Sequence, residues 1–433
     1  MIIKKVIKIV VKIVALVLLY LTLVPLLFIF GVFCRFTRKP KLPPRLLWGF
    51  RPIINNKYFS QALSKNYKST SCVVGVFSIH KKTDFDVVLD LQLKDLVGYF
   101  FWLFKSIYSY DIFHLSFHGG LLRYLSLEVL EPYLYKAAGI KTVLVAYGSD
   151  VHVYDKIANK AYAHTLMSFY PQDYAARKEI LTQIMRWSKH ADVIIPGMLI
   201  PNGFPRWDIV TPNFVVIDSS KFAETIPRKK SDKIVIVHTP NHRIIKGSEY
   251  IISAVKTLQS EGIPVELILI EGLKNDEVLK ILREKADILV EKIIGPSYAL
   301  SGIEGMAAGL PVVGNISTID WDKDMNLFYR YSFLSECPIL NANPESITDT
   351  LRILCSSPKL RNDLGRSGRE YVEKYHSFRA AQHLYGKIYE KIWYGEDVDL
   401  INLYHPLMSD YVKTNPVKHP LVRNDLPVSY SEK

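Results

Sequence analysis

Residues 286–315 contain the side chains whose types and spacing are most suggestive of chemistry. The apolar run Ile288–Val290 is typical of a strand, and a helix is expected to open near Ser301–Gly302, with the carboxylate of Glu304 in its first turn. The free N–H groups and the dipole at the start of such a helix favour an anion such as a diphosphate. A carboxylate just inside the helix can accept hydrogen bonds from ribose hydroxyls. The segment therefore predicts a nucleotide site, with an ordinary buried strand–helix–strand unit as the alternative.

Two loops in the first half of the chain place further polar residues at the ends of expected strands. Asp111–Gly120 contains His114 and His118, and Tyr147–Asp150 follows the next apolar run. Open α/β sheets bind ligands at the carboxyl ends of their strands. A single histidine at a strand end is more often structural, so these residues become candidates only together with the other loops.

A fourth loop, Thr239–Gly247, follows the apolar run Lys233–His238 and precedes a helix. Its basic residues Arg243 and Lys246 could hold a diphosphate, although a Lys–Gly pair before a helix is commonly a surface turn. The four loops together favour a ligand site on one side of two sheets.

These loops are positioned by two series of alternating strands and helices, which predict a doubly wound α/β fold. The 433 residues are sufficient for two or three domains. We expect a first domain over residues 46–222, a linker over 223–232 and a second domain over 233–395 that ends in helices. Residues 396–433 lack periodicity and predict a flexible tail.

The first 45 residues predict a membrane anchor. Ile13–Phe33 has no charged side chain and is long enough to cross a bilayer, and the flanks 1–12 and 34–45 are basic. Residues 1–45 hold nine Lys or Arg and no acid, which leaves only +4 of the net charge of +13 for the remainder and argues against a nucleic-acid partner. The Lys/Arg balance favours a cytoplasmic location for the C-terminal part. We expect residues 40–433 to form a soluble unit.

Two sets of motifs occur in order along the chain. The second half contains His238–Ile251, Leu267–Gly272, Ala286–Val290 and Ser301–Val313, and the first half contains Phe113–His114, Tyr147–Asp150, Ala191–Ile195 and Pro212–Asn213. These motifs resemble those of bacterial retaining GT-B glycosyltransferases of the family-four type, more specifically in the second half. The resemblance covers residues 45–395 and implies two Rossmann-like domains that face a cleft. The first would take the acceptor and the second a nucleotide diphosphate sugar.

The resemblance also implies roles for individual residues. Glu304 matches the carboxylate that holds the donor ribose, and Lys246 matches the basic residue on the donor diphosphate. Arg243 is a second candidate for the diphosphate, although the usual arginine lies further from the lysine. The other candidates are Asn241 on the donor side, the amides of Ser301, Gly302 and Ile303 for the phosphates, and His114, His118 and Asp150 as catalytic residues. One of the two histidines would contact the donor sugar.

Two departures from the family pattern concern the donor. Family members often have a second glutamate eight residues before Glu304, where this chain has Pro296. The glycine-rich loop expected after the first strand is Gly49–Asn56, which has a single glycine, so a close approach of its backbone to the donor is less assured.

The expected activity is transfer of a sugar, with retention, from a nucleotide diphosphate sugar to a glycan or lipid-linked acceptor at the membrane, in the synthesis of a cell-surface polysaccharide or glycolipid. No metal or other cofactor is expected, because cationic side chains and the helix start can stabilise the leaving diphosphate. A catalytically degenerate binding protein of the same fold is the alternative, and Pro296 supports it. A metal-dependent GT-A enzyme would need Asp84–Asp86 or Asp322–Asp324 as a metal-binding pair, and neither follows an apolar strand.

Overall fold

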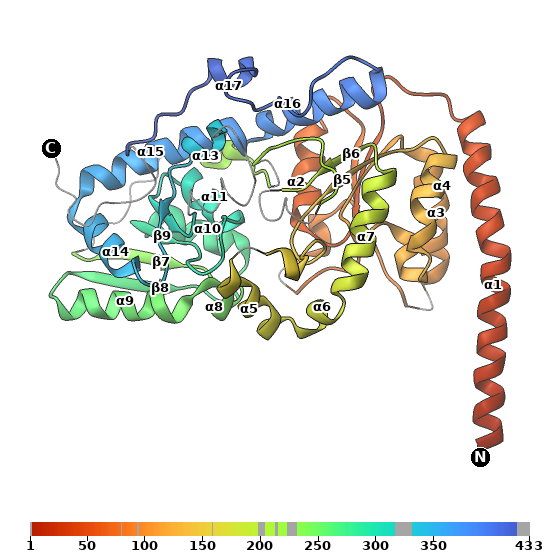
Figure 1. Ribbon diagram of the computed structural model, residues 1–433, viewed down its shortest axis with the longest axis horizontal. Coiled ribbons are helices and arrows are strands. Elements are labelled where there is room, and N and C mark those ends of the chain that lie inside the picture. The colour runs from red at the N-terminus through yellow and green to blue at the C-terminus, as the bar shows by residue number, and fades with distance from the viewer. Residues whose placement is uncertain are drawn as a thin grey trace.

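The computed structural model describes residues 2–78, 80–92, 95–157, 159–197, 204–212, 215–222, 232–316 and 331–421, without the side chains of residues 2–19. Two α/β domains lie end to end, and helix α1 (Ile2–Thr37) runs along the outer end of the first (Figure 1). Each domain contains one parallel sheet. The two Rossmann-like domains and the apolar helix before them confirm the GT-B fold that the sequence predicts. The expected linker over 223–232 lies outside the described residues except at its last position.

The first sheet has the strand order β3-β2-β1-β4-β5-β6, which is that of a Rossmann fold. Its strands are β1 (Leu46–Phe50), β2 (Ser69–Val74), β3 (Val87–Leu89), β4 (Ile112–Leu115), β5 (Lys141–Val145) and β6 (Val193–Ile195). Because side chains alternate along a strand, Leu46 and Trp48 pack on one face of the sheet and Leu47 on the other. The helices of this domain are α2 (Ile54–Leu63) on the first face, α3 (Leu96–Ser109), α4 (Glu131–Ala137) and α7 (Arg177–His190) on the second, and α5 (Lys160–Phe169) and α6 (Pro171–Ala175) after β5.

The second sheet has the order β11-β10-β9-β7-β8. Its strands are β7 (Ile234–His238), β8 (Val265–Leu269), β9 (Ile288–Val290), β10 (Val312–Gly314) and β11 (Leu340–Asn341). Its helices are α8 (Arg243–Lys246), α9 (Ser248–Ser260), α10 (Asn275–Glu284), α11 (Leu300–Ala307), α13 (Ser332–Ser335), α14 (Ile347–Ser356) and α15 (Pro358–Tyr375). Gly305 lets α11 lie directly on the sheet, because a Cβ at this position would collide with Leu289 of β9. The small residues after Glu304 therefore set the position of the helix that starts at the predicted nucleotide site.

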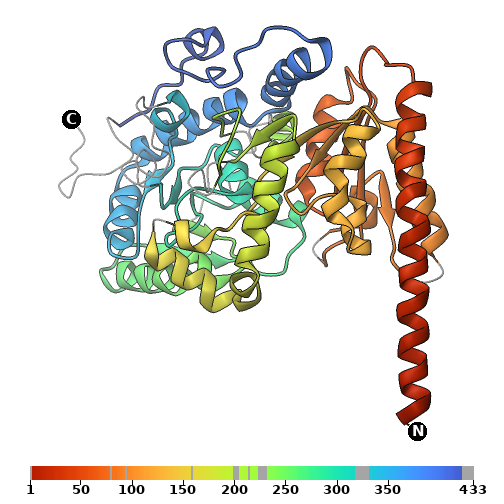
Figure 2. The ribbon, with the colours of Figure 1, turned by 45° about the vertical axis from the view of Figure 1, so that its right-hand side comes forward.

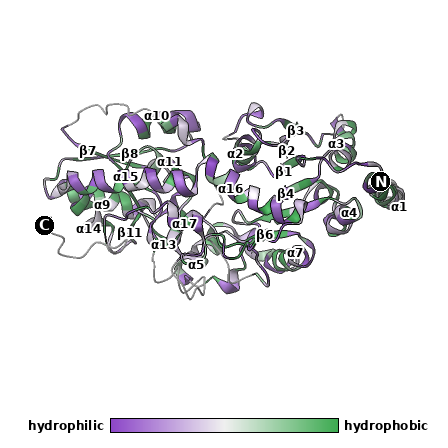
Figure 3. Ribbon diagram, turned by 90° about the horizontal axis from the view of Figure 1, so that it is seen from above, coloured by the Kyte–Doolittle hydropathy of each residue, from purple (hydrophilic) through white to green (hydrophobic). Residues whose placement is uncertain are grey.

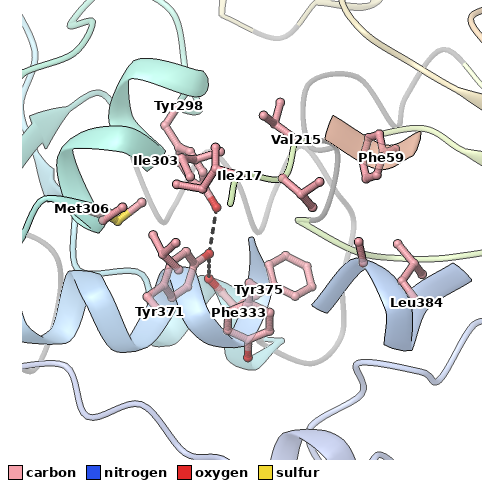
Figure 4. Packing of buried hydrophobic residues seen from close by; sticks show 14 of the residues in the cluster. Phe59, Val215, Ile217, Tyr298, Ile303, Met306, Phe333, Tyr371, Tyr375 and Leu384 are labelled. Atoms are coloured by element: carbon pink, nitrogen blue, oxygen red, sulfur yellow. Dashed lines mark hydrogen bonds between the residues drawn. The ribbon is translucent and has the colours of Figure 1, made fainter. Parts of the chain in front are cut away.

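The chain crosses between the domains at two adjacent places. The amide of Ile217 donates to the carbonyl oxygen of His376 at 2.8 Å, and Ile217 forms an isolated parallel bridge with Ser377. The imidazole of His376 lies 2.8 Å from the carbonyl oxygen of Val215 and 2.9 Å from the hydroxyl of Tyr298. Figure 4 shows the side chains of Val215, Ile217 and Tyr298 within the apolar cluster at this junction.

Helix α16 (Phe378–Tyr389) returns from the second domain and packs on α2 of the first (Figure 1). Its Gln382 donates to the carbonyl oxygen of Ala62 at 2.8 Å, and Trp393 beyond it donates to that of Lys41 at 3.2 Å. The periodicity of residues 378–393 predicts a helix but does not indicate the domain on which its apolar face packs.

Residues 396–421 also pack on the protein, although their composition predicts a flexible tail. They include α17 (Asp410–Thr414) and the buried side chains of Leu400, Tyr404 and Val412. The ring of Tyr404 lies 6.1 Å from that of Tyr375 in α15. Single apolar anchors of this kind have no period, so a search for helical or strand patterns does not find them.

Helix α1 is both the predicted membrane segment and a part of the first domain. Tyr20–Thr37 is long and apolar enough to cross a bilayer. The same segment packs against α3 and α4 (Figure 3). The rings of Phe30 and Phe104 lie edge to face with centroids 5.0 Å apart, and Leu27 and Cys34 are buried. The N-terminal part of α1 continues beyond the domain (Figure 2).

The end of α1 is fixed to the domain by charged side chains. Arg38 donates to the carbonyl oxygens of Ile107 and Ala138, at 2.9 and 2.8 Å, and pairs with the buried carboxylate of Asp111, which also pairs with Arg45. Removal of α1 would uncover the apolar side chains of α3 and α4. The docked helix therefore argues against the expectation that residues 40–433 form a soluble unit. An apolar run has the same sequence pattern whether a helix packs on lipid or on protein.

Candidate functional site

Helix α5 of the first domain contacts the strand loops of the second domain at the domain junction. Tyr162 of α5 lies on Gly295, where a Cβ would meet its ring. Tyr170, just after α5, packs against His242 with ring centroids 5.5 Å apart. Gly295 and His242 belong to the loops that follow β9 and β7. The segment around α5 of the first domain is therefore in contact with two of the predicted polar loops, those after β7 and β9.

A lysine–glutamate pair lies at the carboxyl ends of β7 and β9. Lys246 forms a buried ion pair with Oε1 of Glu291, the residue that follows β9. The same oxygen accepts a hydrogen bond from Ser301 Oγ at 3.1 Å. Oε2 of Glu291 is buried and has no hydrogen-bond partner within the described parts of the chain. Glu291 thus fixes Lys246 beside the first turn of α11 and keeps one acceptor atom for a ligand.

Lys292 adds a second buried cation to this pair. With two lysines and one glutamate, the cluster has a net charge of +1. Burial lowers the pKa of Lys292 to about 8, with Glu291 opposing the change and Lys246 adding to it, so the ammonium is mostly charged at neutral pH. Burial acts to raise the pKa of Glu291, but the two lysines and the hydrogen bonds outweigh it and lower the pKa. A buried excess of positive charge favours an anionic ligand.

His152 brings a side chain of the first domain into this cluster. It is buried, and its Nδ1 has no hydrogen-bond partner among the residues that the structure describes. Burial, together with nearby Lys292, lowers the pKa of His152 to about 4, so its imidazole is neutral at physiological pH. A neutral imidazole can donate to or accept from a sugar hydroxyl without adding charge.

Sequence reasoning missed three of these residues. Glu291 and Lys292 directly follow the apolar run of β9, so their position at a strand end could have identified them. His152 gave no local indication, because its neighbour Lys292 belongs to the other domain and its neighbours Tyr154 and Tyr162 carry no charge.

Glu304 lies in the second turn of α11, since the helix begins at Leu300 and its first turn holds no acid. The carboxylate is buried, and its Oε1 accepts a hydrogen bond from Asn275 Nδ2 at 2.8 Å. Burial raises its pKa to about 7, against the opposing hydrogen bond from Asn275. A carboxylate in this position can accept hydrogen bonds from a diol when it is ionised.

The amides expected to meet the phosphates are partly in use. Those of Gly302 and Ile303 donate to the carbonyl oxygen of Ala299, at 3.0 and 3.3 Å. Ser301, in contrast, is half-exposed, and its hydroxyl contacts Glu291. Of the three predicted residues, Ser301 is therefore the one that the structure places within the lysine cluster.

Arg243 and Asn241 lie outside this cluster. Arg243 is 40 % exposed and pairs with Glu249 at 2.6 Å and with Glu271 at 3.4 Å. Asn241 is exposed. Lys246 and Ser301 thus meet at Glu291, and Glu304 lies three residues further along α11. Arg243 and Asn241 lie at the surface of the second domain.

His114 is a structural residue in the interior of the first domain. Its Nδ1 lies 3.2 Å from the carbonyl oxygen of Leu47 and its Nε2 lies 2.9 Å from the hydroxyl of Tyr389. The ring stacks on Trp48 at 3.7 Å, and burial lowers its pKa to about 3. With both nitrogens occupied, His114 joins α16 to the first sheet. Of the two histidines left open by the sequence, His118 is the one at the end of a strand loop.

Asp150 joins the loops that follow β4 and β5. Its buried carboxylate accepts hydrogen bonds from the amides of Phe117, Tyr147 and Gly148, at 3.0, 3.1 and 2.8 Å. This arrangement fixes the loop that carries His118 and occupies the carboxylate of Asp150 with backbone amides, which does not fit the catalytic role expected for it. Burial raises the pKa of Asp150, and the amide hydrogen bonds oppose that change.

The aspartates considered for a GT-A metal site have other contacts. Asp84 pairs with Lys57 at 2.7 Å, and Asp86 accepts hydrogen bonds from the amide and hydroxyl of Ser71, at 2.7 and 2.8 Å. Asp322 and Asp324 lie outside the described residues.

No known protein-family model matches the chain, and no curated protein sequence matches it. Among solved structures, it is similar to a protein assigned as a UDP-N-acetylglucosamine 2-epimerase from Listeria monocytogenes, with 11% identity and a TM-score of 0.49 over 82% of this chain and 98% of that one. It is also similar to MurG from Acinetobacter baumannii, with 12% identity and a TM-score of 0.40 over 80% and 100% of the two chains. A third is the glycosyltransferase SnogD from Streptomyces nogalater, with 11% identity and a TM-score of 0.42 over 79% and 99%. These proteins are distant in sequence, and the GT-B fold is defined here by the two sheet orders and their connection.

Proposed function

We propose that this chain is a glycosyltransferase that binds a nucleotide diphosphate sugar and transfers its sugar to an acceptor at a membrane. The observation that supports this most is the buried, net positive cluster of Lys246, Lys292 and Glu291 beside the start of α11. Ser301 and Glu304 are three residues apart, about 4.5 Å along the helix axis. This spacing suits the diphosphate and the ribose of one nucleotide.

The two lysines would act on the leaving group. In the proposed reaction the bond between the anomeric carbon and the diphosphate oxygen breaks, and negative charge grows on that oxygen. A hydroxyl oxygen of the acceptor bonds to the anomeric carbon, and its proton passes to the released diphosphate or to water. Cations that are already fixed in a buried place stabilise such a charge most strongly, since they need not reorganise. Lys246 is fixed in this way by Glu291. The proposed step uses no metal and no other cofactor.

The donor sugar would be held by groups other than the glutamate that Pro296 replaces. Oε2 of Glu291 and Nδ1 of His152 are buried polar atoms in this cluster, without partners in the described part of the chain. Both can form hydrogen bonds with sugar hydroxyls. Ser297, beside Pro296, has a left-handed backbone with φ of 80°, a conformation that a serine rarely adopts outside functional loops. Retention of configuration and the family-four type are parts of this proposal that come from the sequence resemblance.

We further propose that α1 holds the protein at a membrane with its catalytic domains in the cytoplasm. The outward side of the docked segment of α1 is apolar, with Leu26, Ile29 and Phe36 between 53 and 82 % exposed. A helix on the surface of a water-soluble protein normally has a polar outer face. Beside it, α3 exposes Val97 and Phe101. The acceptor would then be a glycan or lipid-linked molecule used for a cell-surface polysaccharide or glycolipid.

A nucleotide-sugar-binding protein without activity is the second candidate, and Pro296 favours it. A Pro296→Glu variant separates the two functions. In an active enzyme that holds the sugar by other groups, the added carboxylate should not increase transfer, because it would enter a partly buried place without a partner. Gain of transfer by this variant over an inactive parent would decide for the binding protein.

Titration calorimetry of the full chain in detergent tests donor binding. We expect at least one of the UDP-, GDP- or dTDP-linked sugars to bind, and Glu304→Ala to weaken that binding by about tenfold or more, since charge-assisted hydrogen bonds are lost. Arg366→Gln, which changes an exposed arginine 71 % accessible to solvent, is the matched control and should bind as the unmodified chain does. If none of the donors binds, the proposed site is wrong.

A further inference from the structure

Arg51 and Arg123 lie beside His118 at the carboxyl ends of β1 and β4. Gly49 of β1 is paired with Leu115 of β4. Arg51 comes two residues after Gly49 and His118 three residues after Leu115, so both lie just beyond the same edge of the sheet. Arg123 donates from Nη1 to the carbonyl oxygen of His118 at 3.3 Å. All three side chains are half-buried and therefore within reach of a ligand.

These two arginines have no acidic ion-pair partner within the part of the chain that the structure describes. Arg38 and Arg45, in contrast, both pair with Asp111. Arg123 forms a neutral hydrogen bond with Gln183 Oε1 at 2.9 Å, and Arg51 lies over the ring of Phe77 at 5.9 Å. Burial, with both arginines nearby, lowers the pKa of His118 to about 3, so the imidazole is neutral and adds no charge. Asp173 is near enough to Arg51 for the guanidinium to act on its pKa, but the two form no ion pair, and Tyr124 is hydrogen-bonded to Arg51. Guanidinium groups that form no ion pair with a carboxylate favour a phosphate group, which they bind with bidentate geometry.

The loop that carries this cluster is held in place from α4. The buried carboxylate of Glu131 accepts hydrogen bonds from the amides of Gly120 and Leu122, at 2.6 and 2.7 Å. It fixes the backbone between His118 and Arg123, so the cluster exists before a ligand binds.

The cluster also adjoins the predicted membrane helix. The hydroxyl of Tyr20 in α1 donates to the carbonyl oxygen of Leu125, two residues after Arg123, at 2.9 Å. The N-terminal part of α1 extends beyond the domain (Figure 2). A basic cluster beside a helix whose outward face is apolar is suited to meet the headgroups of a bilayer.

We propose that Arg51 and Arg123 bind a phosphate group on the acceptor, and that this acceptor is an amphiphile whose apolar part lies along α1. His118 then lies beside the part of the acceptor that receives the sugar. That the bound amphiphile is the sugar acceptor rests on the proposed function. The phosphate site itself can be tested without measuring sugar transfer.

Binding of farnesyl diphosphate to the full chain in dodecyl maltoside tests the site. Arg51→Gln and Arg123→Gln should each weaken binding by about tenfold, the loss expected for one charge-assisted pair, whereas the control Arg366→Gln should have no effect. Farnesol should bind at least about tenfold more weakly than farnesyl diphosphate to the unmodified chain. Equal binding by both arginine variants and the control would overturn the proposal.

Two further ligands distinguish a lipid phosphate from free phosphate and the acceptor site from the donor site. Inorganic pyrophosphate that binds as tightly as farnesyl diphosphate, with the same arginine dependence, would show a site for free phosphate and overturn the lipid acceptor. A nucleoside diphosphate should bind both variants as it binds the unmodified chain. If Arg51→Gln weakens nucleotide binding and leaves farnesyl diphosphate binding intact, Arg51 belongs to the donor site and the inference is wrong. Arginine-dependent binding of farnesyl diphosphate by a chain that binds no nucleotide would instead refute the proposed function and leave the phosphate site in place.

Discussion

Replacing Glu304 with glutamine should stabilise the unliganded protein at pH 8. The folded carboxyl has a pKa of about 7, raised by burial from its ordinary value near 4.5. At a pH between 4.5 and about 7, the folded state keeps a proton on Glu304 that the unfolded state has lost. The free energy of unfolding therefore falls as the pH rises through this range. A shift of about 2.5 units at 1.36 kcal/mol per unit gives a loss of about 3 kcal/mol, complete above pH 7. Glutamine keeps an acceptor for Asn275 and removes the charge.

Urea unfolding of the full chain in detergent, measured at pH 5, 6, 7 and 8, checks this reasoning. The difference between Glu304→Gln and the unmodified chain should be small at pH 5 and grow to about 3 kcal/mol in favour of the variant at pH 8. At pH 8 the variant should also bind the nucleotide about tenfold or more weakly, because the ionised acceptor of the ribose hydroxyls is gone. A variant that is less stable than the unmodified chain at pH 8 would refute the pKa argument. Unchanged nucleotide affinity would show that Glu304 does not bind the ribose hydroxyls.

Three other changes test separate parts of the structure. Lys246→Ala should lower the rate of sugar transfer more than it lowers nucleotide affinity, because its charge matters most as the leaving group forms; equal losses in initial-rate kinetics and calorimetry would contradict this. His118→Ala should lower the rate of sugar transfer and leave nucleotide affinity and melting temperature nearly unchanged. His114→Ala should lower the free energy of unfolding by about 2–4 kcal/mol, because the stack on Trp48 is lost and a cavity is left. The reverse pattern would exchange the roles of the two histidines. Deletion of residues 1–39 should give a chain that aggregates in detergent-free buffer, since it uncovers α3 and α4; a monodisperse product in size-exclusion chromatography would show that α1 is not part of the domain.

The fold could be predicted from the sequence because apolar residues recur with a clear strand or helix period in most of its elements. The apolar runs over residues 233–238 and 288–290 predict β7 and β9, and both strands form there. Contacts between domains could not be predicted in the same way. Both His114 and His118 lie in the loop region after an expected strand, and the contacts of His114 with Leu47, Trp48 and Tyr389 show that the first is structural.

The candidate site shows the same limit. Lys246 and Glu304 were found from their loops, but their partners Glu291 and Asn275 come from other strands and helices. The charge state of Glu304 depends on burial, which a sequence pattern at a helix start does not give. The docked position of α1 was missed for a related reason, because apolar residues such as Leu27 and Cys34 fit equally well against lipid and against α4.

The release of nucleoside diphosphate from a bound nucleotide sugar tests the central claim most directly. The full chain in detergent is incubated with the donor that it binds and with a lipid extract of membranes, and both the released nucleotide and the sugar in the extract are measured. We predict release matched by incorporation of the sugar, and at least about tenfold less of both with Lys246→Ala. Tight donor binding with no release above the protein-free rate, or release that Lys246→Ala leaves unchanged, would contradict the proposal that this buried cationic cluster catalyses sugar transfer.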